Sequence, residues 1–210
     1  QMLRDFGINS PDIHASMSLC LGPCEVSVSE MVSAYTAFAN HGIRTAPMFV
    51  SRIEDNEGNT IATFQPRMNE VIGAENAMKM LTMLMGVVDG GTAGRLRYRY
   101  NLEGQIGAKT GTTNNNSDGW FIGFTPQLVS GCWVGGEERD IHFDSMNMGQ
   151  GATMALPIWA IFMKKVYADP TLGIRPDVKF DLPDGYDPCY KPKSDQDDFE
   201  QVDGIDEVFE

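Results

Sequence analysis

Basic residues are scarce in this chain of 210 residues, which holds 16 Lys and Arg against 29 Asp and Glu. The net charge of −13 argues against nucleic acid as the main partner, because phosphate binding needs a basic face. The same sign argues against an anionic membrane surface. Long apolar runs are also lacking: the longest weakly charged one, residues 152–163, is too short to span a bilayer. The chain starts at Gln1 with no targeting segment, as a mature protein or an excised fragment would.

Metal-binding residues are few and scattered. The sequence has four cysteines and three histidines, and the histidines do not cluster. Cys20 and Cys24 form Cys-Leu-Gly-Pro-Cys, but the second pair of ligands that a zinc site needs is absent. We therefore expect neither a metal nor another cofactor. A Cys20–Cys24 disulfide stays open as an alternative to free thiols.

Acidic residues gather at the C-terminal end of the chain. The segment from Asp181 to Glu210 contains 11 acidic and two basic residues, interspersed with proline and glycine and without helical periodicity. Such a composition predicts an acidic, partly disordered tail at 181–210. An acidic docking tail is the functional alternative. Residues 1–180 are then the folded part, with room for a hydrophobic core.

Hydrophobic periodicity and turn signals divide residues 1–180 into helices and strands. Ser27 and Glu30 form a capping box at the start of a predicted helix over 27–42. Further predicted elements are a hairpin with strands 48–50 and 61–64, a helix over 74–88, strands 104–113, 120–125 and 128–134, and a helix over 154–166. The link between the last two strands is so short that they must be antiparallel. The pattern predicts an α+β fold in which an antiparallel sheet packs against helices.

The motif Lys109-Thr110-Gly111-Thr112-Thr113 lies in the predicted strand 104–113, and its residue types suit ligand binding. Lys109 places an ammonium where it can attract a carboxylate or ease proton movement at a nucleophile. The hydroxyls of Thr110 and Thr112 can hold a carboxylate. Gly111 leaves room for a ligand backbone at the strand edge, where an extended peptide would bind by strand addition. A free N–H on that edge, such as that of Thr112, can serve as an oxyanion donor.

A Lys-Thr-Gly tripeptide alone occurs often by chance, but its surroundings here are distinctive. Residues 107–126 read Gly-Ala-Lys-Thr-Gly-Thr-Thr-Asn-Asn-Asn-Ser-Asp-Gly-Trp-Phe-Ile-Gly-Phe-Thr-Pro. This stretch closely resembles the third motif of the penicillin-binding proteins, in particular the transpeptidase domain of the bifunctional (class A) peptidoglycan synthases. The resemblance covers residues 2–168 and includes the segments 18–42, 91–93, 118–123 and 149–163.

The resemblance implies a transpeptidase fold of the penicillin-binding-protein/β-lactamase-like type and a serine-type D-Ala-D-Ala transpeptidase. A serine would attack a stem peptide and form an acyl-enzyme, which an amine of a neighbouring stem then resolves. β-Lactam antibiotics would acylate the same serine. By resemblance, Lys109 and Thr112 are catalytic, and Thr110, Gly111 and Thr113 bind substrate. The terminal carboxylate would rest on Lys109 and the two hydroxyls, and the Thr112 N–H would supply half of the oxyanion hole.

The sequence departs from this family in its other two motifs. No serine has a lysine three positions later, so the nucleophile motif is absent, and the only Ser-x-Asn tripeptide, Ser145-Met146-Asn147, follows the Lys-Thr-Gly motif instead of preceding it. We therefore expect residues 1–180 to be the C-terminal portion of a transpeptidase domain whose N-terminal part lies elsewhere in the parent. The chain alone should be inactive, and because its sheet would expose an apolar face or an unpaired edge, we expect self-association or partial disorder.

The family implies that the parent protein is also a glycosyltransferase, anchored in the cytoplasmic membrane and acting in the bacterial periplasm or at the cell surface. Its partners would be stem peptides with D-Ala-D-Ala ends and β-lactams, without nucleic acid. Two alternatives remain open. One is a β-lactamase-related protein, and the other is a non-catalytic cell-wall-binding or interaction module.

Overall fold

The computed structural model describes residues 1–11, 13–22 and 24–186, which contain both helices and antiparallel strands. The α-helices are α1 (Met2–Asp5), α2 (Val28–Ala39), α3 (Ala74–Asp89), α4 (Arg95–Tyr98), α5 (Met146–Gly149) and α6 (Gly151–Ala168). The strands are β1 (Ile43–Thr45), β2 (Arg52–Glu54), β3 (Thr60–Thr63), β4 (Met68–Glu70), β5 (Gly107–Thr112), β6 (Asp118–Phe124) and β7 (Val129–Gly135). The predicted α+β class is confirmed.

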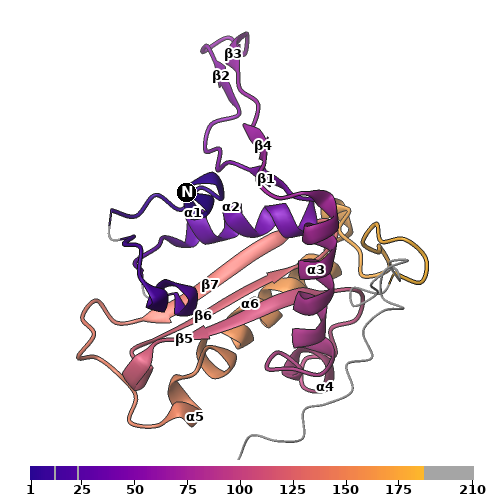
Figure 1. Ribbon diagram of the computed structural model, residues 1–210. Helices are drawn as coiled ribbons and strands as arrows, with labels where there is room; N and C mark the ends of the chain where they lie inside the picture. The colour runs from indigo at the N-terminus through magenta and orange to yellow at the C-terminus, as the bar shows by residue number, and fades with distance from the viewer. Residues whose placement is uncertain (12, 23, 187–210) are drawn as a thin grey trace, which may run out of the picture.

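The central sheet is antiparallel, with strand order β5-β6-β7. Thr125 N donates to Leu128 O at 2.9 Å and closes the short link between β6 and β7, so the predicted hairpin is confirmed. Side chains alternate between the two faces of the sheet. Phe121 and Gly123 meet Trp159 of α6, whereas Ile122 meets the α2 side. Helices α2 and α6 thus cover opposite faces, and β5 lies at an edge of the sheet (Figure 1).

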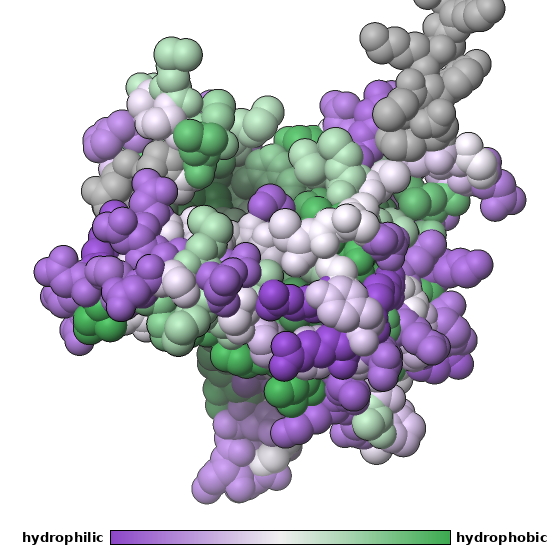
Figure 2. Space-filling view, turned by 90° about the horizontal axis from the view of Figure 1, so that it is seen from below, coloured by the Kyte–Doolittle hydropathy of each residue, from purple (hydrophilic) through white to green (hydrophobic). Residues whose placement is uncertain are grey.

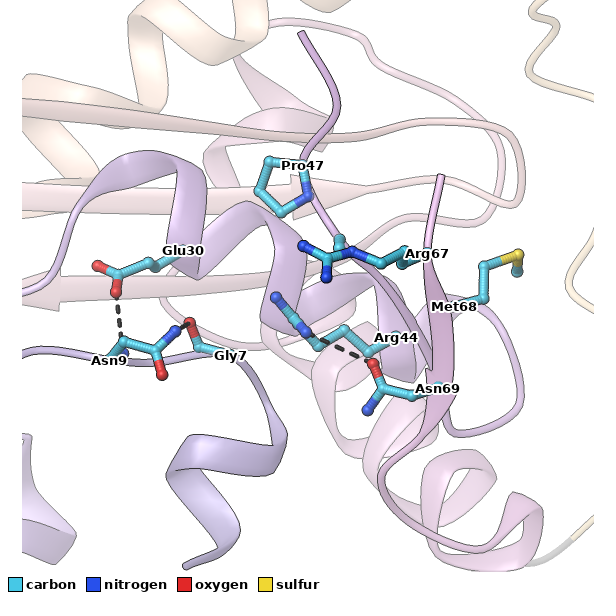
Figure 3. Close-up of a pocket in the computed structure, with 9 residues that line it drawn as sticks. Gly7, Asn9, Glu30, Arg44, Pro47, Arg67, Met68 and Asn69 are labelled. Carbon is cyan, nitrogen blue, oxygen red and sulfur yellow. Dashed lines mark hydrogen bonds between the residues drawn. The ribbon is translucent and has the colours of Figure 1, made fainter. Parts of the chain in front are cut away.

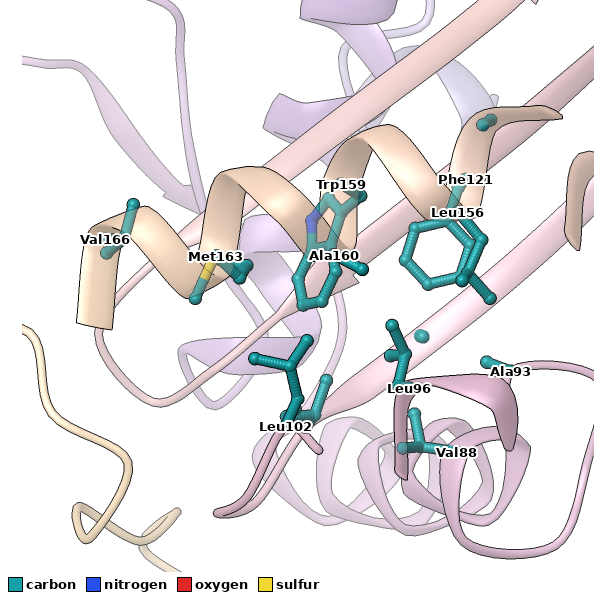
Figure 4. Packing of buried hydrophobic residues seen from close by; sticks show 13 residues of the cluster. Val88, Ala93, Leu96, Leu102, Phe121, Leu156, Trp159, Ala160, Met163 and Val166 are labelled. Carbon is teal, nitrogen blue, oxygen red and sulfur yellow. The ribbon is translucent and has the colours of Figure 1, made fainter. Parts of the chain in front are cut away.

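The main hydrophobic core lies between α6 and the sheet (Figure 4). Phe121 and Leu156 are fully buried, and the rings of Phe121 and Trp159 lie 5.3 Å apart. Trp159 Nε1 donates to Ser130 Oγ at 2.8 Å, so the indole N–H keeps a partner in this apolar setting. Burying each such large side chain contributes roughly 1.5–3 kcal/mol, and this core attaches α6 to the strand that carries the motif.

Local signals place the two other long helices. The capping box is present: Glu30 N donates to Ser27 Oγ at 3.2 Å, and Ser27 N donates to Glu30 Oε2 at 2.9 Å. Helix α2 therefore begins where it was predicted. Helix α3 also matches the predicted range, and its buried residues are Ala77, Leu81, Leu84 and Val88.

The two-stranded β2–β3 hairpin projects away from the body, above the β1–β4 pair (Figure 1). Its turn was predicted correctly: Asp55 Oδ1 accepts the N–H groups of Glu57 and Asn59 at 2.9 and 2.8 Å. The predicted strand at 48–50 is wrong, because the hairpin register starts at Arg52 opposite Thr63 and leaves residues 48–50 without a partner strand.

Several other expectations can now be placed. Cys20, Cys24 and Cys132 are free thiols, and within the described ranges no cluster of His, Cys, Asp and Glu could hold a metal ion. No described helix is long and apolar enough to cross a bilayer. Phe180 is still buried, but residues 187–210 of the predicted acidic tail lie outside the described residues.

Candidate functional site

The motif 109–113 begins on the edge strand β5 and continues into the turn that follows it. Its cross-strand partners are Ile122 for Lys109 and Phe121 for Thr110. Cross-strand partners share a face, so Lys109 lies on the α2 side and Thr110 on the α6 side. Because β5 is an edge strand, every second backbone group on its outer side lacks a partner in the sheet. A ligand that touches both side chains must therefore lie along that edge.

Lys109 is exposed, and its Nζ donates to Thr110 O at 2.6 Å. Within the part of the chain that the structure describes, no carboxylate oxygen lies within 4.0 Å of this ammonium. Its charge is therefore available to an anionic group from outside the described residues.

A mostly apolar hollow of about 280 Å³ adjoins Lys109. We call it the motif hollow; its lining includes Thr110 and Gly111 of β5 and, from α2, Met31 and Tyr35. Burial raises the pKa of Tyr35 to about 12, so its phenol is neutral at physiological pH. The motif hollow thus combines one cation at its rim with a neutral wall.

The threonine hydroxyls of the motif have partners within the fold. Thr110 Oγ1 lies 2.9 Å from Thr92 Oγ1, which comes from the turn after α3. Thr112 Oγ1 accepts the N–H of Gly151, the first residue of α6, at 3.1 Å. These contacts attach β5 to the elements on both of its sides. The sequence does not mark Thr92 as a site residue, although the stretch 91–93 is part of the resemblance to the penicillin-binding proteins.

The carboxylate of Asp118 holds the turn that follows β5, which we call the corner. Thr113 Oγ1 donates to Asp118 Oδ1, and Trp133 Nε1 donates to Asp118 Oδ2 at 3.1 Å. Asn115 and Asn116 adopt left-handed backbone conformations in this turn, which asparagine tolerates better than most residues. The predicted site residues therefore divide by position: Lys109, Thr110 and Gly111 line the motif hollow, whereas the hydroxyls of Thr112 and Thr113 contact α6 and the corner.

Comparison with known proteins gives a consistent result. A model of the penicillin binding protein transpeptidase domain matches residues 5–131. Penicillin-binding protein 1A from Neisseria meningitidis is 34% identical over 170 residues, which are 78% of this chain and 21% of that protein. The protein of the same name from Aquifex aeolicus is 36% identical over 166 residues, 79% of this chain and 21% of that protein. The chain thus spans about a fifth of the length of these relatives.

Solved structures show the same fold. Penicillin-Binding Protein 1A from Haemophilus influenzae superposes with a TM-score of 0.74 at 26% identity, covering 86% of this chain and 31% of that one. The PonA1 protein from Mycobacterium tuberculosis, in complex with penicillin V, superposes with a TM-score of 0.71 at 22% identity. That match covers 91% of this chain and 54% of PonA1.

Proposed function

The chain belongs to the penicillin-binding protein transpeptidase family, and on that premise we propose that it is the C-terminal portion of a peptidoglycan DD-transpeptidase domain. Residues 1–180 would form this portion, and 181–210 an acidic extension. The observation that carries the proposal is Lys109: an exposed ammonium without a carboxylate partner in the described chain, on an edge strand beside an apolar hollow.

The roles of the motif follow from what each group offers a peptide that ends in a carboxylate. Lys109 attracts that carboxylate, and the hydroxyl of Thr110 joins it at the strand edge. Gly111 lets the peptide backbone approach β5 and bind by strand addition. The N–H of Thr112 donates to the oxyanion that develops during acyl transfer. Thr113 borders the substrate and, through its bond to Asp118, sets the end of the strand.

The nucleophile belongs to another part of the parent protein, because no serine in this chain has a lysine three positions later. In the complete domain, the serine oxygen attacks the penultimate D-alanine carbonyl of a stem peptide, and the terminal D-alanine leaves with the proton. The amine of a second stem then takes the acyl group and frees the serine. β-Lactams would acylate the same serine, and the chain by itself would form no acyl-enzyme.

The location of the parent follows from its substrate. Stem peptides are built into the bacterial wall outside the cytoplasmic membrane, so we place the parent in the periplasm or at the cell surface, with an anchor in that membrane. The missing part of the domain would cover the apolar wall of the motif hollow. Without it, the chain would self-associate. Separate apolar patches among hydrophilic residues on the face seen in Figure 2 support this expectation, as does the exposure of the large apolar side chains Phe49 and Leu21.

Peptide binding tests the role of Lys109 separately from catalysis. A labelled peptide ending in D-Ala-D-Ala is titrated against the chain and against Lys109→Ala. We expect roughly tenfold weaker binding by the variant, since a hydrogen bond to a charged group contributes about 1.5–3 kcal/mol. Lys164→Ala is the matched control, because Lys164 is exposed on α6, a helix on the opposite face of the sheet. Equal binding by the unsubstituted chain and by Lys109→Ala would favour the alternative of a non-catalytic interaction module.

Acylation tests the absence of the nucleophile. A fluorescent penicillin incubated with the chain should leave no covalent label after denaturation, whereas the complete parent protein should be labelled. Stoichiometric label on any serine of residues 1–210 would contradict the assignment of the nucleophile to another part of the parent.

A further inference from the structure

A second hollow, of about 680 Å³, lies on another side of α2 and shares no lining residue with the motif hollow. We call it the arginine hollow (Figure 3). Its lining comes from the segment before α2, from α2 itself, and from β1, β4 and the residues beside them: Gly7, Asn9, Glu30, Arg44, Ala46, Pro47, Arg67, Met68 and Asn69. Two guanidinium groups therefore face a polar hollow in a chain of net charge −13.

Arg44 is held in place by the fold. It is half-buried, its Nε donates to Ser33 Oγ at 3.0 Å, and its Nη1 lies 3.5 Å from Asn69 Oδ1. The guanidinium also rests on Gly7, where an added Cβ would lie 2.0 Å from Arg44 Nη2. Gly7 has a φ of +83°, a conformation that glycine adopts without strain. The backbone thus leaves space for this guanidinium and fixes its position before any ligand arrives.

Arg67 places a second positive charge beside the first (Figure 3). It is exposed, and across the described residues no carboxylate oxygen lies within 4.0 Å of either guanidinium. Glu30, also in the lining, is an ionised carboxylate that accepts the N–H groups of Ser27 and Asn9, each at 2.9 Å, and it forms no ion pair with either arginine. Two neighbouring guanidinium groups that lack an ion-pair partner among the described residues favour an incoming anion.

We propose that the arginine hollow binds carboxylate groups of an acidic peptide. The planar guanidinium fork matches the two oxygens of a carboxylate, and two adjacent forks suit a peptide with closely spaced acidic side chains. Arg44 is held by its hydrogen bond to Ser33, whereas Arg67 is exposed and free to adjust. Arg67 can therefore move to bind a carboxylate that Arg44 already holds.

Such a peptide has two sources. One is the chain itself: residues 187–210 carry nine acidic residues and two lysines. Asp181 Oδ2 lies 3.7 Å from His41 Nε2, and His41 precedes Arg44 by three residues in the sequence. These 24 residues could extend over roughly 80 Å, which is ample reach. The other source is an acidic segment of a separate protein, and the experiment distinguishes the two.

The test measures binding of a fluorescein-labelled octaglutamate to the full chain by anisotropy at low salt. We expect Arg67→Gln and Arg44→Gln each to weaken binding about tenfold, through lost charge-assisted hydrogen bonds. Arg52→Gln is the control, because Arg52 is an exposed arginine that pairs with Glu54 at 2.8 Å outside the hollow. Lys164→Gln, at an exposed lysine of α6 that lines neither hollow, should leave binding within twofold. Arg67 is exposed, so its variant should fold even if Arg44→Gln does not.

A variant in which every Asp and Glu of residues 195–210 is replaced by Asn or Gln identifies the source of the acidic peptide. Tighter octaglutamate binding by that variant means that the chain's own segment competes for the hollow, and unchanged binding means that the ligand is external. Both outcomes support the site. No measurable binding, or equal losses for Arg67→Gln and Arg52→Gln, would overturn the proposal. A loss confined to Lys109→Gln would place the peptide at the motif strand and would also overturn it, without bearing on the transpeptidase assignment.

Discussion

Gly151 joins helix α6 to the motif strand, and replacing it with alanine should loosen that junction. An added Cβ would lie 2.3 Å from Gly111 O and 2.4 Å from Trp120 O. Both atoms belong to the backbone of paired strands, so neither can move without disturbing the sheet. The Gly151 N–H also donates to Thr112 Oγ1 at 3.1 Å, a bond that any shift of α6 would lengthen.

Three contributions set the size of the effect. Alanine gains up to roughly 0.5–1 kcal/mol over glycine in a helix. Forcing extra volume into a packed contact costs about 1–3 kcal/mol, and losing a hydrogen bond costs about 0.5–1.5 kcal/mol. We therefore expect Gly151→Ala to lower the free energy of unfolding by about 0.5–4 kcal/mol. For a domain of this size, each kcal/mol corresponds to roughly 2–4 °C in Tm.

Gly86→Ala is the matched control, because the sign of its effect should be opposite. Gly86 lies inside α3, and an added Cβ there meets no atom within 4 Å. Only the higher helix propensity of alanine remains, so this variant should be about 0.5–1 kcal/mol more stable than the unsubstituted chain. Urea unfolding followed by circular dichroism measures both. If Gly151→Ala is at least as stable as the unsubstituted chain, the close approach of α6 to β5 does not constrain the fold.

Three further outcomes are expected. Phe121→Ala should lower the free energy of unfolding by about 3–5 kcal/mol, measured in urea, because the ring is fully buried against Trp159. Hydrogen bonds from the N–H groups of Ser27 and Asn9 lower the pKa of Glu30 below its ordinary value of 4.5. The ionised carboxylate therefore stabilises the fold above pH 4.5, and this stabilisation is lost as the pH falls through the lowered pKa. Glu30→Gln should flatten that part of the curve of unfolding free energy against pH. Tyr35 should ionise near pH 12 in the folded chain, as followed by absorbance at 295 nm. If Tyr35→Phe instead removes a titration step near pH 10.0, the ordinary value for tyrosine, the burial of Tyr35 is contradicted.

Local patterns were sufficient for much of the fold and for the motif. The capping box of Ser27 and Glu30 acts over three residues, and the stripe along α3 repeats within each turn, so both can be recognised without knowing the rest of the chain. The same holds for the strand that carries Lys109 and for the short link between β6 and β7. The failed strand at 48–50 was apolar enough, but its partner residues are set by the hairpin register.

The sequence by itself determined the helices and strands around the core, the family, and the motif with its lysine. Only the tertiary structure decided which distant residues come together: β1 pairs with β4, Thr92 meets Thr110, α6 meets β5, and Arg44 and Arg67 line one hollow. The physical reason is range. Caps, turns and periodic stripes depend on neighbours a few residues away, whereas these contacts join segments 18 to 39 residues apart and form only when the packed core brings them together.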